Sequence, residues 1–262
     1  MRAVVRSNRR RVPLRRVLGL WWGLFVTATA TAAVAGETHV AVAANFTAAA
    51  REIAAAFAQA SGHRAILSFG STGKLYTQIA NGAPFELLLA ADQTRPTRLV
   101  DEGLGVAGSQ FTYARGKIVL YSRDPELVDP QGAVLHRRDA FSKLAIANPK
   151  TAPYGGAAVE VLRGLAVYEA VAGQLVMGDN IAQTYQFVAT TNAELGFVAY
   201  AQVVADHGGS QWLVPETLYT PIRQDAVLLT GGKANPVARA FLAFLRQPAA
   251  RAIIQRFGYG LD

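Results

Sequence analysis

The feature that most constrains the fold is an alternation of short apolar runs with segments of helical periodicity. Runs of four to six mostly apolar residues, bounded by Gly, Pro or polar residues, predict strands that are buried on both faces. Such runs lie at 39–43, 65–69, 85–90, 117–122, 144–147, 195–199 and 225–230. Helical patterns lie between them, at 48–60, at 73–80, from Gly155, from Ile181 and over 236–257. Alternating strands and helices predict an α/β protein.

The order of these segments predicts two lobes. The strands at 117–122 and 225–230 are separated by a second set of strands and helices. An α/β unit that is interrupted by another and then resumed is expected for two lobes joined by two crossing strands. We therefore predict a first lobe over 36–114, a second lobe over 115–219 and a return to the first lobe over 220–262. Each lobe is expected to be a mostly parallel sheet flanked by helices.

The N-terminal segment has the pattern of an export signal. Residues 1–35 hold seven arginines and no acidic residue, and an apolar run over 17–34 ends in the small residues Ala33-Val34-Ala35. This order predicts a cleavable signal peptide over 1–35. A membrane anchor is the alternative, because 18 residues could just span a bilayer. The pair Arg10-Arg11 leaves Sec and twin-arginine export both open.

Charge and cysteine content bear on partners and location. The chain has 26 basic and 18 acidic residues, but removing the seven N-terminal arginines leaves 19 against 18. The remainder is nearly neutral, so the charge does not indicate a nucleic-acid partner. The chain contains no cysteine, which excludes disulfides and a lipid-modified cysteine. We expect a periplasmic protein that is not a lipoprotein.

Four predicted helix starts share one design, in which a strand ends, a few small or polar residues follow and a helix begins. These turns are 43–47, 70–73, 152–155 and 179–181. A helix N-terminus has unpaired N–H groups and about half a positive charge, so it can bind an anion. Ligands of open α/β sheets bind beyond the carboxyl ends of strands. Each turn alone is better explained by ordinary capping, and only the combination of the four predicts an oxyanion site.

Several blocks of the chain resemble the periplasmic molybdate-binding proteins of ABC transporters, within the type II substrate-binding class. The resemblance is carried by GSTG at 70–73, NPKTAPYG at 148–155 and the segment from GAP to AAD at 82–92. Similar stretches also lie at 40–57, 111–122, 179–183 and 195–203. The resemblance implies the two-lobed type II fold, no enzymatic activity and no cofactor. It also implies capture of molybdate and tungstate by a monomer, and delivery to an inner-membrane permease with a cytoplasmic ATPase.

The resemblance also implies the residues that contact the anion. Asn45 lies at the first contact turn, and Thr72 falls where the family donates from a hydroxyl and a backbone N–H. Tyr154 and Ile181 lie where backbone N–H groups meet the anion, so the ring of Tyr154 is expected to matter little. One family branch has a contacting tyrosine where this chain has Ala199, which points to the other branch.

Neighbouring residues are expected in secondary roles. Ala44 precedes Asn45 and lacks the hydroxyl that some relatives have, while Ser71 and Asn180 are expected to cap the helices that follow them. Molybdate, tungstate and sulfate are dianions with no proton to donate, so their site needs donors only. Asp179 is expected to point outward as a cap, and Lys74 is expected on the surface.

The sequence also bears on three other functions: a receptor for a different oxyanion, an exported hydrolase and a nucleotide-binding protein. A receptor for another oxyanion, such as sulfate or phosphate, stays open, because cavity size cannot be read from the sequence. An exported hydrolase is not favoured, since no G-x-S-x-G motif is present and the four histidines show no ligand spacing. The segment GSTGK lacks the leading glycine and the final Ser or Thr of a P-loop. We therefore predict no nucleotide, metal or nucleic-acid site.

Overall fold

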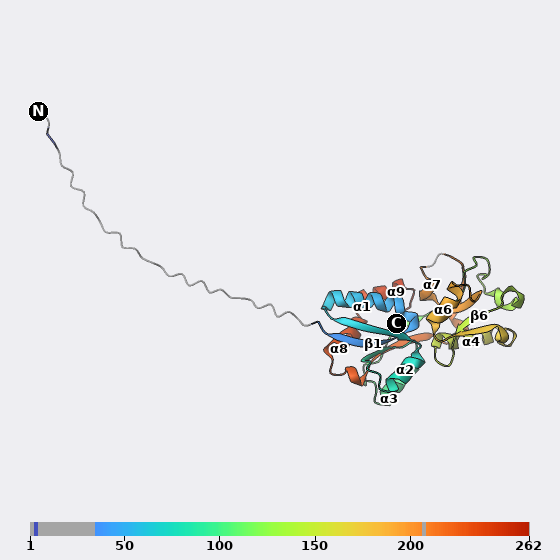
Figure 1. Cartoon of the computed structure of the whole chain (residues 1–262), viewed down its shortest axis with the longest axis horizontal. Coiled ribbons are helices and arrows are strands. Elements are labelled where there is room, and N and C mark those ends of the chain that lie inside the picture. The colour runs from blue at the N-terminus through green and yellow to red at the C-terminus, as the bar shows by residue number, and fades with distance from the viewer. Residues whose placement is uncertain (1–2, 5–34, 206–207, 262) are drawn as a thin grey trace. The chain divides into compact units, whose positions relative to one another are not determined.

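A computed structural model describes residues 3, 4, 35–205 and 208–261 (Figure 1). The predicted signal peptide lies almost entirely outside the described residues, and so does the apolar run at 17–34. Within the described ranges, no helix is long and apolar enough to cross a membrane. The part of the chain from Val34 onward forms one compact unit, which contains two sheets.

The first sheet has five strands in the order β2-β1-β3-β10-β4. Its strands are β1 (Glu37–Ala43), β2 (Arg64–Gly70), β3 (Leu87–Leu89), β4 (Phe111–Gly116) and β10 (Ile222–Leu228). The flanking helices are α1 (Thr47–Ser61), α2 (Thr72–Ala80), α3 (Thr94–Asp101), α8 (Pro236–Phe244) and α9 (Pro248–Arg256) (Figure 1). Side chains of β1 alternate between the faces: Val40 and Val42 pack with α1, α8 and α9, and Ala41 packs with α2 and α3.

The second sheet also has five strands, in the order β7-β6-β8-β5-β9. Its strands are β5 (Ile118–Ser122), β6 (Leu144–Ala147), β7 (Leu175–Gly178), β8 (Leu195–Ala199) and β9 (Ser210–Leu213). The flanking helices are α4 (Pro153–Gly164), α5 (Tyr168–Val171), α6 (Ile181–Ala189) and α7 (Tyr200–Val203). Val161 of α4 belongs to the core on one face, and Val188 of α6 and Val203 of α7 belong to the core on the other.

Short 3-10 helices complete the described part of the chain. They are η1 (Ala44–Phe46), η2 (Ala133–His136), η3 (Arg138–Ala140), η4 (Ala172–Gln174), η5 (Glu216–Leu218) and η6 (Thr230–Gly232). The first of them matters for the site, because η1 connects the end of β1 to the start of α1.

Both sheets are mixed, where the sequence predicts mostly parallel ones. In the first sheet β1 is parallel to β2 and β3, whereas β10 is antiparallel to β3 and β4. The second sheet likewise has two parallel and two antiparallel pairings. The chain leaves the first sheet after β4 and re-enters it at β10, so these two strands run in opposite directions. The α/β fold is confirmed, and the exact lobe limits stay a prediction.

Several predicted elements agree closely with the structure. Strands β6 and β8 and the start of α6 are as predicted, and α1 ends at Gly62 in the left-handed conformation with φ +73°. Strand β10 begins at Ile222, three residues before the predicted start. The C-terminal segment, whose pattern allows one or two helices, forms two, because Pro248 starts a new helix.

Candidate functional site

A small pocket lies where four helix starts meet. Its cavity volume, as the space open to a water-sized sphere, is about 10 Å³, and its walls come from the turns before η1, α2, α4 and α6, together with Ala91. Two of these turns follow strands of the first sheet, β1 and β2, and two follow strands of the second, β6 and β7. The pocket is lined by all seven residues that the sequence singles out: Ala44, Asn45, Ser71, Thr72, Tyr154, Asn180 and Ile181.

The helix starts leave backbone donors at the pocket. Asn180 caps α6 by accepting from the N–H groups of Ala182 and Gln183 at 2.9 and 3.1 Å, so the N–H of Ile181 is not used by the cap. The first residue of α4 is Pro153, which has no N–H, so Tyr154 supplies the first N–H of that helix. Together with the start of η1, these termini place positive ends of peptide dipoles around one small space.

Two hydroxyl groups are buried in the same wall. Ser71 and Thr72 are 3% and 1% exposed. The oxygen of Ser71 is buried without a hydrogen-bond partner, and its side chain does not cap α2. The predicted capping role of Ser71 is therefore wrong. The Thr72 oxygen accepts from the backbone N–H of Ala91 at 3.0 Å, which leaves the hydroxyl proton free to be donated.

The side chain of Asn45 is engaged by other protein groups. Its Nδ2 donates to Oε1 of Gln224 at 2.8 Å and to the hydroxyl of Tyr259 at 3.2 Å. An asparagine amide has two N–H bonds, and both are accounted for by these partners. In this structure the Asn45 amide, which lies within η1, is thus bonded to Gln224 and Tyr259, and a contact between Asn45 and the anion stays a prediction.

The ring of Tyr154 is also part of the structure around the pocket. It is 1% exposed, and its hydroxyl accepts from Nε2 of Gln224 at 3.3 Å. A Cβ at Gly116 would lie 2.1 Å from this hydroxyl, so the ring packs directly on the end of β4. Burial raises the pKa of Tyr154 well above its usual value, and the hydroxyl stays protonated. The ring therefore has a packing role that the sequence did not predict, and the expectation that its identity matters little for anion binding stays a prediction.

The pocket itself carries no charge on the described side chains that line it. Lys74 and Asp179 lie outside it and form an ion pair of 2.9 Å, with 50% and 66% of their side chains exposed. Asp179 is exposed, as predicted, and Asn180 is the residue whose side chain caps α6, also as predicted. Within the described residues, no cluster of three His, Cys, Asp or Glu side chains could hold a metal ion.

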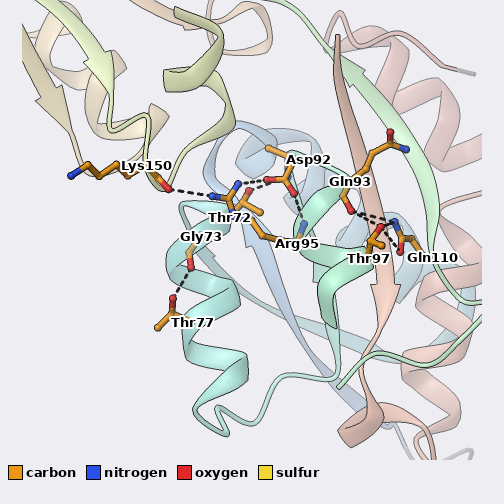
Figure 2. A network of polar contacts seen from close by, with 10 residues as sticks. Thr72, Gly73, Thr77, Asp92, Gln93, Arg95, Thr97, Gln110 and Lys150 are labelled. Atoms are coloured by element: carbon orange, nitrogen blue, oxygen red, sulfur yellow. Dashed lines mark hydrogen bonds and ion pairs between the residues drawn. The ribbon is translucent and has the colours of Figure 1, made fainter. Parts of the chain in front are cut away.

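A wider groove lies beside the small pocket and shares Ala91 and Pro153 with it. Figure 2 shows Arg95 at its wall, between the carboxylate of Asp92 and the backbone oxygen of Lys150, which it reaches at 3.2 Å. Because Arg95 is paired with Asp92, its charge is largely balanced within the groove. The groove is larger than the small pocket, but its size does not make it the better candidate for the binding site. A small inorganic anion needs only a small space lined by hydrogen-bond donors.

Two mixed sheets that both contribute helix starts to one small donor-lined pocket define a solute-binding protein of the two-lobed periplasmic class. The sequence pattern of the bacterial extracellular solute-binding proteins matches residues 38–260, and the chain belongs to this family. The family binds solutes and is not enzymatic, which agrees with the prediction from the sequence.

Named relatives are similar over nearly the whole chain. The molybdate-binding protein ModA of Azotobacter vinelandii is 57% identical over 251 residues, which cover 95% of this chain and 98% of that protein. ModA of Rhodobacter capsulatus is 53% identical over 234 residues, with 89% and 92% covered. A solved structure of an Azotobacter vinelandii periplasmic molybdate-binding protein superposes with a TM-score of 0.83 at 38% identity, covering 86% of this chain and 99% of that chain. The resemblance predicted from the sequence is confirmed.

Proposed function

We propose that this protein captures molybdate, and also tungstate, and delivers the anion to an ABC importer. The observation that carries the proposal is the buried Ser71 hydroxyl, which has no protein partner and lies in a pocket formed by four helix starts. An unpaired buried hydroxyl costs about 1–3 kcal/mol, so an acceptor that enters the pocket recovers this free energy. The molybdate-binding relatives support the choice of anion.

The pocket suits an anion that has no proton to donate. The donors are the hydroxyls of Ser71 and Thr72 and the backbone N–H groups at the starts of η1, α2, α4 and α6. Hydrogen bonds to a charged group are worth about 1.5–3 kcal/mol each. No carboxylate lines the described wall to accept a proton from hydrogen phosphate. The chemistry therefore favours fully deprotonated dianions over protonated oxyanions.

The proposal includes a location and partners. Residues 1–35 act as a cleavable signal peptide, and the absence of cysteine excludes a lipid-modified N-terminal cysteine. The mature chain acts as a periplasmic monomer and passes its anion to an inner-membrane permease driven by a cytoplasmic ATPase. The signal pattern of residues 1–35 and the family of the chain support this location and these partners.

Calorimetry of the chain lacking residues 1–35 tests the function. Molybdate and tungstate should bind with similar affinity, and sulfate and phosphate should bind more weakly or not at all. Ser71→Ala and Thr72→Ala should each raise the Kd for molybdate about 10- to 100-fold, because each removes a donor to a charged ligand. Thr77→Ala is the matched control, since its hydroxyl lies on the same helix but is exposed and donates to Gly73. Sulfate or phosphate binding without molybdate binding would make the protein a receptor for that other oxyanion.

A further inference from the structure

Gln224 is a buried polar residue outside the pocket. It is fully buried on β10, at the point where the pairing of β10 with β4 shifts its register between Gln224 and Asp225. It does not line the small pocket. A buried side-chain amide is costly unless its donors and acceptor are satisfied, so its partners indicate what it does.

The partners of Gln224 include a pocket residue from each sheet. Its Oε1 accepts from Nδ2 of Asn45 at 2.8 Å, and its Nε2 donates to the hydroxyl of Tyr154 at 3.3 Å. Asn45 lies in η1 after a strand of the first sheet, and Tyr154 lies in the first turn of α4 on the second sheet. One side chain therefore connects the two contact turns, which come from different sheets.

Each end of this connection is held in place by further contacts. The hydroxyl of Tyr259 donates to the backbone oxygen of Asn45 at 2.7 Å, which restrains the backbone of the turn as well as the side chain. At the other end, Gly116 lets the Tyr154 hydroxyl lie directly against β4. A movement of either turn would therefore strain or break its hydrogen bond to Gln224.

We propose that Gln224 is a positioning residue that sets the separation of the Asn45 turn and the first turn of α4 for one oxyanion. The proposal rests on the proposed function of the pocket. Backbone N–H groups cannot be re-aimed by a change of rotamer, so their geometry depends on the placement of whole elements. Binding sites need their contact groups held to within about 0.5 Å, and a buried amide bonded to both turns provides this restraint.

A purely structural role for Gln224 makes a different prediction. It would lower the stability of the free protein and leave the Kd of the folded protein unchanged. Tyr113→Phe is the matched control, because the single proton of the Tyr113 hydroxyl is shared between the same Oε1 at 3.2 Å and the backbone oxygen of Ala90 at 3.1 Å, neither of which belongs to the pocket wall. Gln224→Met and Tyr113→Phe both remove buried hydrogen bonds. Of these two substitutions, only Gln224→Met breaks the link between the Asn45 turn and the first turn of α4.

The test compares Gln224→Met, Tyr154→Phe, the double variant and Tyr113→Phe in the chain lacking residues 1–35. Sodium molybdate is titrated by calorimetry, its release rate is measured by stopped-flow tryptophan fluorescence, and ligand-free stability is measured by thermal unfolding. Gln224→Met should raise the Kd about tenfold through faster release, and Tyr154→Phe should raise it about threefold. The double variant should bind as Gln224→Met does, since both remove the same link. Tyr113→Phe should leave the Kd within about twofold of the wild type.

Three outcomes would overturn the assignment. They are a Gln224→Met variant that binds as the wild type does, a Tyr113→Phe variant that loses as much affinity, or additive losses in the double variant. If Gln224→Met does not fold, the Kd values of Tyr154→Phe and Tyr113→Phe are compared instead, and equal values would overturn the assignment. A wild type that does not bind molybdate overturns the proposed function, and the positioning role falls with it.

Discussion

The Nζ of Lys74 and the Oδ2 of Asp179 lie 2.9 Å apart and form an ion pair at the edge of the pocket. Lys74 belongs to α2 on the first sheet, and Asp179 precedes α6 on the second. Beside this pair, the backbone N–H of Gly73 donates to the oxygen of Thr151 at 2.8 Å, again between turns of the two sheets. These contacts require the two halves of the pocket wall to be close together.

The first prediction concerns this ion pair. Lys74→Met and Asp179→Asn should each speed molybdate release about two- to fivefold, since an exposed pair is worth about 1 kcal/mol or less. The effect should shrink at high salt because the pair is screened. Stopped-flow release rates at low and high ionic strength provide the measurement.

The control for this prediction is a similar pair within one sheet. Arg64 and Glu37 lie 3.0 Å apart on neighbouring strands of the first sheet, and Arg64→Met should not alter release. The charge reversal Lys74→Asp with Asp179→Lys should restore slow release. Equal acceleration by Arg64→Met would show that the effect is one of net charge.

The second prediction separates stability from binding at Ser71. Ser71→Ala removes a buried hydroxyl with no protein partner, so it should leave the ligand-free protein equally stable or stabilise it by about 1 kcal/mol. Molybdate should then raise the melting temperature less than it does in the wild type. Thr38→Val removes another unpartnered hydroxyl that is fully buried but outside the pocket, and it should leave the molybdate-induced shift intact. A large loss of ligand-free stability in Ser71→Ala would contradict the unpaired state of the hydroxyl.

The third prediction compares two glycines. Gly116→Ala should destabilise the protein by about 1–3 kcal/mol and weaken molybdate binding, because its Cβ would lie 2.1 Å from the Tyr154 hydroxyl and 2.8 Å from Nε2 of Gln224. Gly156→Ala in α4 meets no atom within 4 Å and should stabilise the protein by about 0.5–1 kcal/mol through helix propensity. Denaturant unfolding of the two variants checks the pair. Equal destabilisation of the two variants would contradict the prediction. It would mean that an added methyl group in α4 lowers stability as much as the one at the contact of Gly116 with Tyr154.

The fourth prediction concerns alkaline pH. Burial raises the pKa of both Tyr113 and Tyr154 well above the usual value of 10.0. The folded state therefore keeps these protons while the unfolded chain loses them, so this contribution to stability is complete below pH 10 and falls above it. Urea unfolding from pH 8 to 11 should show the decline, and Tyr154→Phe should make it less steep. The same slope in both proteins would indicate that other groups control alkaline unfolding.

Much of the site could be predicted from local sequence patterns. A strand that ends in small or polar residues and is followed by a helix places its turn at the carboxyl edge of a sheet. This rule predicted the four turns that line the pocket, whereas the resemblance to a known family implied Thr72, Tyr154 and Ile181 as the contact residues within them. The helix start at Ile181 with its Asn180 cap also follows from residues within a few positions of each other.

Other parts of the site depend on partners that are distant in the sequence. Gln224 contacts Asn45 across 179 positions, and Tyr259 contacts it across 214. No periodicity or short motif marks Gln224 as a partner of residues that line the pocket, and its strand starts earlier than the apolar pattern indicates. The hydrogen bonds of the Asn45 amide and of the Tyr154 hydroxyl to Gln224 could not be predicted for this reason.

The sequence by itself determined the α/β class, most of the elements and the four donor-bearing turns, because these follow from hydrophobic periodicity and turn chemistry over a few residues. Only the tertiary structure decided which polar groups are free. Ser71 and Asn45 are both polar residues at helix starts, yet Ser71 has an unpaired hydroxyl and Asn45 an amide satisfied by Gln224 and Tyr259. Whether a polar group is satisfied depends on the partners that lie beside it in the folded chain. For Asn45 these partners, Gln224 and Tyr259, are 179 and 214 positions away in the sequence.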